Sequence, residues 1–164
     1  GMTPMEYRKL LEICDAKYKA YEKAGCETYF NKKDHLWTLY EYETGQFKLP
    51  ENAEKGMIYG GCNCGNCHIT ISSNGDVMAC RRVTDSKVAN VFEDRLADVW
   101  ICQMEKYRNY DRFEKCSKCE LKAWCRGCPA VANGTSGNFY APDPQCWKTR
   151  NEITGEELLM EAAS

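Results

Sequence analysis

Apolar residues recur at helical spacing along the first part of the chain. Thr3 and Glu6 form a capping box ahead of them, and Pro4 suits the first turn of a helix. The pattern predicts a helix that begins after Thr3 and ends at Gly25. The positions that share its apolar face are Tyr7, Leu10, Leu11, Cys14, Tyr18 and Tyr21.

A second, shorter helix is predicted over residues 33–44. Its inward residues are Leu36, Leu39 and Tyr40, and Gly45 provides the stop. A polar stretch follows, in which no periodicity persists. These elements predict a helical N-terminal region that ends before the first group of cysteines.

A β-hairpin is the next predicted element. Residues 68–72 form the first strand and residues 76–79 the return strand. Asn74 and Gly75 form the turn, because both residue types tolerate a positive φ angle. The return strand brings Cys80 back towards the start of the hairpin.

The rest of the chain predicts two more helices separated by an irregular segment. One helix starts near Asp94, residues 116–147 are expected to be irregular, and a capping box at Thr154 and Glu157 opens a short C-terminal helix. The buried stripe expected on the helix after Asp94 is Leu96, Val99, Trp100, Met104 and Tyr107.

The predicted fold is a small, irregular α+β structure. It has N-terminal helices, a β-hairpin, a further helix and a cysteine-rich C-terminal part held together by metal. The polar linker 46–60 predicts a boundary, which gives a helical region with linker at 1–59, a cysteine-rich domain at 60–148 and a C-terminal helix at 149–164.

Length and charge narrow the class of protein. The chain has 164 residues and a formal net charge of −2, so it lacks the excess of basic residues typical of nucleic-acid-binding domains. It contains no run of ~18 apolar residues, so no membrane-spanning segment is expected. The first residues show no export signal, which favours a cytoplasmic location.

Twelve cysteines are the main chemical feature of the chain. Disulfides would be the usual explanation in a secreted protein, and metal binding in a cytosolic one. Close spacing favours metal, because Cys62, Cys64 and Cys67 lie within one turn-sized segment and Cys116 and Cys119 within another. We therefore expect these thiols to bind a metal centre.

An iron–sulfur cluster of the 4Fe–4S type requires four converging thiolates. Ten cysteines lie between Cys62 and Cys146, enough for two such clusters. Tetrahedral zinc also uses Cys-x2-Cys pairs, so zinc is an alternative occupant. The candidate ligands are Cys62, Cys64, Cys67, Cys80, Cys116, Cys119, Cys125, Cys128 and Cys146.

The order of these cysteines resembles the SPASM domain, the auxiliary iron–sulfur domain that follows the barrel of radical S-adenosylmethionine enzymes that modify peptides. The matching features are Cys62-x12-Gly75-x4-Cys80, Cys116-x2-Cys119-x5-Cys125, the later Cys128, and Asp143-Pro-Gln-Cys146-Trp147. The resemblance covers about residues 60–148. The chain departs from the family in having two residues, and not three, between Cys125 and Cys128.

The resemblance implies two 4Fe–4S clusters with crossed ligand sets. The outer cluster would be held by Cys116, Cys119, Cys125 and Cys146. The inner cluster would be held by Cys62, Cys80 and Cys128. Its fourth ligand would be Cys67 or Cys64, and Cys67 is preferred because four intervening residues give the chain room to reach a second iron.

The resemblance also implies a function in electron transfer and in positioning a ribosomal peptide substrate. The Cys-x3-Cys-x2-Cys loop of the family's barrel is absent from this sequence, so we expect no catalysis by this chain alone. S-adenosylmethionine would enter only through a partner radical S-adenosylmethionine barrel. Two alternatives are a stand-alone, ferredoxin-like electron carrier and a zinc-stabilised module that binds a protein or peptide.

Overall fold

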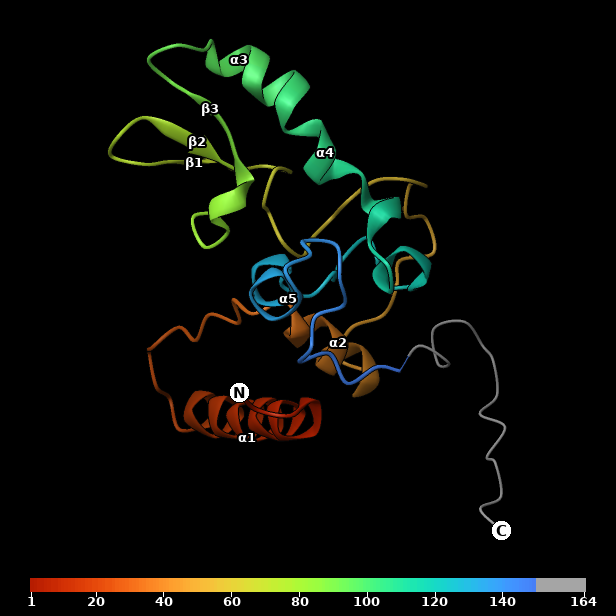
Figure 1. Ribbon diagram of the computed structural model, residues 1–164. Helices are drawn as coiled ribbons and strands as arrows, with labels where there is room; N and C mark the ends of the chain where they lie inside the picture. The colour runs from red at the N-terminus through yellow and green to blue at the C-terminus, as the bar shows by residue number, and fades with distance from the viewer. Residues whose placement is uncertain (150–164) are drawn as a thin grey trace.

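The structure, a computed structural model, describes residues 1–149 (Figure 1). Helix α1 (Pro4–Lys23) lies at one end of the molecule and a small antiparallel sheet at the other. Helices α2 (Leu36–Glu43) and α5 (Pro129–Ser136) lie between them, together with the cysteine-rich loops. The predicted small α+β fold is confirmed, whereas the helix expected at Thr154 lies outside the described residues.

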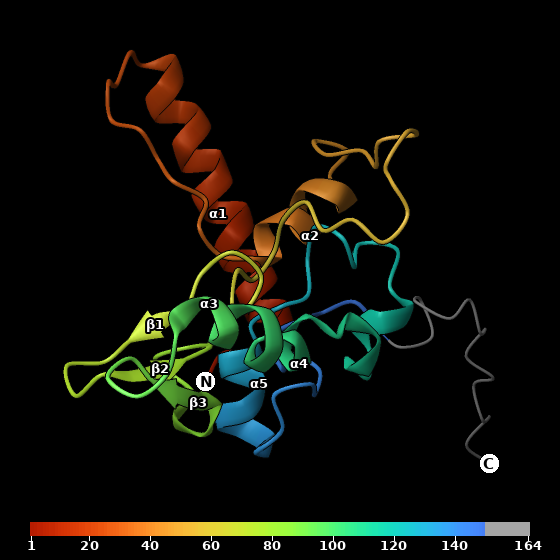
Figure 2. The ribbon, with the colours of Figure 1, turned by 90° about the horizontal axis from the view of Figure 1, so that it is seen from above.

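Helix α1 begins where the sequence predicts. The side chain of Thr3 accepts a hydrogen bond from the Glu6 amide at 3.3 Å, and the Glu6 carboxylate accepts one from the Thr3 amide at 2.8 Å. The C-terminal end of α1 projects away from the rest of the molecule (Figure 2). Of the residues on the predicted apolar face, Leu11 is buried, whereas Leu10 and Tyr21 are exposed.

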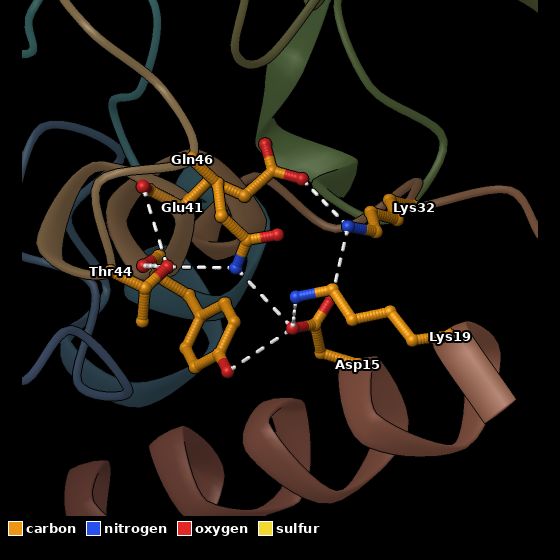
Figure 3. A network of polar contacts seen from close by, with 7 residues as sticks. Asp15, Lys19, Lys32, Glu41, Thr44 and Gln46 are labelled. Atoms are coloured by element: carbon orange, nitrogen blue, oxygen red, sulfur yellow. Dashed lines mark hydrogen bonds and ion pairs between the residues drawn. The ribbon is translucent and has the colours of Figure 1, made fainter.

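Buried Asp15 joins α1 to the segment that follows it (Figure 3). Its carboxylate accepts hydrogen bonds from Lys19 at 2.6 Å, Lys32 at 3.3 Å and Gln46 at 3.3 Å. Burial alone would raise the pKa of Asp15, but the hydrogen bonds from these three side chains lower it below its ordinary value of 3.8. The ionised carboxylate therefore stabilises the folded arrangement.

Helix α2 is shorter than the predicted 33–44. The Asp34 carboxylate accepts a hydrogen bond from the Leu36 amide at 2.8 Å, which fixes the start of the helix. Leu36, Leu39 and Tyr40 are buried as predicted. They belong to a core formed by Leu11, Leu36, Trp37, Leu39, Tyr40, Leu121 and Cys125.

This core crosses the boundary predicted at residue 60. It joins both N-terminal helices to the part of the chain that includes Leu121 and Cys125, and Cys119, Cys146 and Trp147 pack against it. The division into domains stays a prediction. The packing is nevertheless continuous from α1 to the cysteine-rich loops.

The sheet contains the predicted hairpin and one further strand. Strands β1 (Thr70–Ile71) and β2 (Asp76–Met78) pair antiparallel, and β3 (Lys87–Asn90) adds to the other edge of β2. The pairing places Val77 opposite Ile71 on one side and Ala89 on the other, with an irregularity in the second ladder between Val77 and Met78. Strand β3 was not predicted.

The hairpin turn differs from the predicted one. Gly75 has a φ of +86°. Every residue with a positive φ among residues 1–149 is a glycine, so Asn74 does not have the positive φ that the predicted turn requires. The Gly75 amide donates to the Ser72 carbonyl at 2.9 Å, and the Ser72 amide donates to the Asp76 carbonyl at 2.9 Å. A Cβ at Gly75 would lie 2.6 Å from the ring of Phe92, so this position requires glycine.

The helix predicted after Asp94 is broken into three pieces. They are α3 (Leu96–Asp98), the π-helical turn η2 (Val99–Gln103) and α4 (Glu105–Arg108). Val99, Met104 and Tyr107 are buried as predicted, whereas Leu96 is 42% exposed. Shorter 3-10 turns are η1 (Thr84–Ser86), η3 (Tyr110–Arg112) and η4 (Cys116–Lys118).

A second core lies beneath the sheet and the broken helix. Its buried members are Cys64, Val77, Ala79, Val83, Ala89, Val99, Met104, Tyr107, Phe113 and Phe139. The segment 116–147 was predicted to be irregular, but it contains α5, in which Pro129 occupies the first turn and Gly137 caps the C-terminus with a φ of +72°. No helix within residues 1–149 is long and apolar enough to cross a bilayer.

Candidate metal centres

Three thiols from one short run and a fourth from later in the chain line one small cavity. Cys116 and Cys119 come from the η4 turn, in which the Cys119 amide donates to the Cys116 carbonyl at 3.1 Å. Cys125 and Cys146 complete the set, which we call the outer set. The other lining residues are Leu39, Lys115, Leu121, Gly127, Asp143 and Lys148.

Local turns hold the last two thiols of the outer set in place. The Cys125 amide donates to the Leu121 carbonyl at 2.7 Å, and Leu121 is itself fully buried. The Cys146 amide donates to the Asp143 carbonyl at 3.1 Å, which turns the chain back towards the cavity. The late cysteine therefore reaches the other three, as the sequence requires for a shared centre.

Burial opposes the ionisation of three of the outer thiols. Burial raises the pKa of Cys116 to about 12 and that of Cys125 to about 12, and it also raises the pKa of Cys119. The Lys115 ammonium donates to the Cys146 sulfur at 3.2 Å. These buried thiols stay protonated unless a metal centre replaces their protons.

A second group of thiols lines an open cavity nearer the sheet. Cys62, Cys80 and Cys128 form this group, which we call the inner set, and the cavity offers about 840 Å³ of water-accessible space. Ser86 fixes Cys80 at the end of β2, because its hydroxyl accepts from the Cys80 amide at 3.1 Å and donates to the Cys80 carbonyl at 3.0 Å.

Cys64 and Cys67 differ in burial and in their contact with the inner set. Cys64 is only 4% exposed, and its thiol donates to the Ala79 carbonyl at 3.0 Å. Contact with the Cys64 thiol lowers the pKa of Cys62. The same contact raises the pKa of Cys64, and burial and the nearby thiols of Cys80 and Cys128 raise it further. Cys67 is exposed and does not line the cavity.

The short segment between Cys125 and Cys128 directs its two cysteines to different cavities. Gly127 has a φ of +63°, and a Cβ there would lie 2.5 Å from the Cβ of Asp143. The Asp143 carboxylate accepts a hydrogen bond from the Cys128 amide at 2.7 Å. Two intervening residues therefore suffice to separate the thiols, provided that the second is glycine.

Arg126 lies buried between the two cavities, with only 3% of its surface exposed. Its guanidinium donates to the carbonyls of Gly60 at 2.9 Å, Cys62 at 3.0 Å and Lys122 at 2.9 Å, and it stacks on the Tyr110 ring. From the sequence alone, an ordinary surface position was equally plausible for this residue. The structure makes it a buried cation that links the start of the cysteine-rich region to the Cys125 segment.

His35 is a site residue that the sequence did not reveal. It precedes α2 and lines the open cavity, where its side chain contacts Cys62 and lowers the pKa of that thiol after the larger effect of Cys64. No local motif connects His35 to a cysteine far along the chain, so no sequence signal could have found it. His68 lines the same cavity and is exposed.

Thiol donors suit both zinc and iron–sulfur clusters, which differ in the spacing of the ligands that they need. Within residues 1–149, no three histidine, cysteine or carboxylate side chains converge tightly enough to hold one metal ion. Zinc requires such convergence because its Zn–S bonds are only about 2.3 Å long. A 4Fe–4S cube binds one thiolate at each iron corner and so accepts more widely spaced thiols. None of the twelve cysteines, all within the described residues, forms a disulfide.

Two cavities that gather several thiols each suit an iron–sulfur cluster-binding domain, and the sequence comparison points to the same class. Residues 62–129 match the SPASM family, described as an iron–sulfur cluster-binding domain. This part of the chain is similar to a SPASM domain.

One similar curated protein is an AdoMet-dependent heme synthase from Nitratidesulfovibrio vulgaris (strain Hildenborough). It is 30% identical over 108 residues, which are 63% of this chain and 29% of the relative. The chain thus spans less than a third of the length of that relative. No solved structure matches the chain.

Proposed function

We propose that this chain is the auxiliary-cluster part of a radical S-adenosylmethionine system and binds two 4Fe–4S clusters. The observation that supports this most strongly is the divergence of Cys125 and Cys128. These two cysteines are separated by two residues yet line different cavities, each with further thiols. A single zinc knuckle would instead use both cysteines of such a pair on one ion.

The outer cluster is held by Cys116, Cys119, Cys125 and Cys146. The inner cluster is held by Cys62, Cys80 and Cys128, with Cys64 as its fourth ligand and Cys67 as the second candidate. Neither thiol lines the cavity itself. The first choice is supported by the contact of Cys64 with Cys62 and by its proximity to Cys80 and Cys128, whereas Cys67 is exposed. This choice reverses the preference based on sequence spacing.

The clusters carry out one-electron transfer, and the chain provides the charges and hydrogen bonds that set their reduction potentials. Lys115 donates to the sulfur of Cys146, and Arg126 places a buried positive charge beside both sets. Positive charge and hydrogen bonds to sulfur favour the reduced, more negative cluster and so raise its potential. The chain itself relays electrons and positions substrate, and a partner barrel generates the radical.

The substrate of the complete system is proposed to be a ribosomal peptide, on the strength of the family resemblance. The name of the relative favours a second candidate, an enzyme that acts on a non-peptide substrate, as a heme synthase does. In either case the partner is a radical S-adenosylmethionine barrel. The reduced thiols needed for cluster binding support a cytoplasmic location.

The ligand assignment is tested with paired serine variants of holoprotein prepared without oxygen. Cys125→Ser should remove one cluster and Cys128→Ser the other, so that each loses about four of about eight irons and a different electron paramagnetic resonance signal. Cys102→Ser is the matched control, because Cys102 is exposed and lines neither cysteine cavity. Loss of the same signal in both variants would contradict the two-cluster proposal.

A further inference from the structure

The open cavity beside the inner set is rich in positive charge. Four cationic side chains line it, together with both histidines of the chain, although the formal charge of the whole chain is −2. The cavity is defined by the inner-set thiols and by Lys32, Lys33, Asp34, His35, Thr38, Gly61, Asn63, His68, Thr70, Arg81, Arg82 and Ala130. We call it the cationic cavity.

Three of these cations have no acidic partner in the described part of the chain. Lys32 is occupied, since it pairs with Asp15 and Glu41. Lys33, Arg81 and Arg82 are exposed and form no ion pair within residues 1–149. Their charges remain available to a ligand in the cavity.

The one carboxylate in the cavity lining is already engaged. Asp34 accepts a hydrogen bond from the Leu36 amide at 2.8 Å and another from the Tyr7 hydroxyl, whose pKa is raised by burial and by this bond. Asp34 keeps its negative charge, but it stands alone against the four cationic side chains of the lining, so positive charge remains in excess. A low-dielectric wall lined by charges of one sign concentrates ligands of the opposite sign.

We propose that the cationic cavity binds an organic polycarboxylate directly beside the inner cluster. Arg81 and Arg82 each present a planar guanidinium that matches a carboxylate, and Lys33 adds a third positive charge. The cavity is within the ~300–1,000 Å³ range of small-molecule sites. The inference rests on the proposed function, which places a cluster at the inner set.

Carboxylate is favoured over phosphate by the backbone around the cavity. Phosphate sites commonly use free amides at a helix N-terminus. Here the N-terminal amide of α2, at Leu36, is already bonded to Asp34.

The start of α5 also lines the cavity through Cys128 and Ala130. Pro129 has no amide hydrogen, the Ala130 amide bonds the Cys128 thiol, and the Val131 and Ala132 amides donate to the Cys128 carbonyl. The cavity therefore offers side-chain cations and no free helix amide from α2 or α5, and pyrophosphate provides the competing probe.

The cluster does not account for these cations. Arg126 is the buried positive charge beside the thiols, and it bonds the Cys62 carbonyl at 3.0 Å. Arg81 and Arg82 are exposed, and they line the open cavity with the inner set. A ligand that occupies the cavity would contact the arginines on one side and lie beside the inner-set thiols on the other.

The test uses anaerobically prepared holoprotein and calorimetric titration with benzene-1,3,5-tricarboxylate at fixed ionic strength. We expect saturable binding that the Arg81→Gln/Arg82→Gln double variant weakens at least tenfold. Arg95→Gln is the control, because Arg95 is exposed and does not line the cavity. Hexaglutamate is titrated in parallel, and tighter binding of hexaglutamate would identify an acidic peptide as the source of the carboxylates.

Four outcomes decide the inference. Binding that is lost in the double variant and that alters the resonance signal of the inner cluster supports it. No saturable binding, an equal loss in Arg95→Gln, or tighter binding of pyrophosphate than of the tricarboxylate overturns it. Iron and sulfide are measured on the same samples. If the chain carries both clusters but does not bind the tricarboxylate, only this inference is refuted. If the chain binds the tricarboxylate but carries no inner cluster, the anion site is supported and the proposed function is refuted.

Discussion

The carboxylate of Asp143 accepts a hydrogen bond from the amide of Cys128 at 2.7 Å, and Asp143 is itself buried. The backbone carbonyl of Asp143 accepts from the Cys146 amide at 3.1 Å. One residue thus orders a cysteine of each set, so the closing segment and the Cys125–Cys128 segment form a single structural unit. A change that distorts the backbone of either segment should therefore affect both proposed clusters, whereas loss of a single ligand thiol should affect only its own cluster.

Gly127→Ala tests this unit. The new Cβ would meet the Cβ of Asp143 at 2.5 Å, and alanine would have to adopt a φ of +63°. The left-handed backbone alone costs about 1–2 kcal/mol, and the close contact adds to that cost. We expect a lower unfolding temperature and loss of iron from both clusters, measured by calorimetry and metal analysis.

Gly134→Ala is the matched control for this variant. Gly134 lies in α5, and no atom lies within 4 Å of a Cβ built there. Alanine should stabilise the helix by up to about 1 kcal/mol. Full iron content and an unchanged unfolding temperature in Gly127→Ala would show that the two segments are not coupled.

The fourth ligand of the inner cluster is tested by Cys64→Ser and Cys67→Ser. Cys64 is buried against Cys62, whereas Cys67 is exposed. We expect Cys64→Ser to lose about four irons, the content of one cluster, and Cys67→Ser to retain all of them. The opposite result would restore the preference for Cys67 that its spacing from Cys62 suggests.

Lys115→Gln tests whether the chain tunes the outer cluster. The ammonium lies 3.2 Å from the Cys146 sulfur, so its removal takes away both a positive charge and a hydrogen bond to a ligand. We expect an unchanged iron content and a lower midpoint potential for the outer cluster, measured by redox titration. Lys118→Gln, an exposed neighbour, should leave both potentials unchanged. Equal shifts in the two variants would indicate a general charge effect.

Asp15→Asn tests the attachment of α1. Hydrogen bonds to a charged group contribute about 1.5–3 kcal/mol each, and we expect a loss of unfolding free energy of this order at pH 7. Glu12→Gln removes an exposed pair with Lys9 and should cost less than about 1 kcal/mol. Denaturant unfolding of the three proteins measures both differences.

The pH dependence of this difference has a definite sign. The pKa of Asp15 is lowered in the folded state, so its stabilisation is complete above the ordinary value of 3.8 and is lost as the pH falls through the folded-state value. The difference between the wild-type chain and Asp15→Asn should therefore be constant from pH 7 to pH 5. A difference that disappears within that interval would contradict the network in Figure 3.

Local chemistry explains which elements the sequence predicted. The capping box at Thr3 and Glu6 and the glycine at position 75 act over a few residues, and both hold in the structure. The π turn at Val99–Gln103 was missed because periodicity assumes a constant helical repeat. Strand β3 was missed because its residues become a strand only by pairing with β2.

The candidate site also contains features that the sequence predicted and features that it did not. The family resemblance predicted the two ligand sets, and these stay a prediction. The structure places Cys146 on the cavity that Cys116, Cys119 and Cys125 also line. The roles of His35 and Arg126 depend on tertiary contacts with Cys62, which no sequence pattern encodes. The choice between Cys64 and Cys67 depends on burial, which spacing does not reveal.

The most direct test of the central claim is the content of iron, acid-labile sulfide and zinc per chain, measured on protein purified without oxygen. Two 4Fe–4S clusters predict about eight irons and about eight sulfides with little zinc. About two zincs without sulfide, each held by four ligands, would contradict the account and make the protein a structural zinc module.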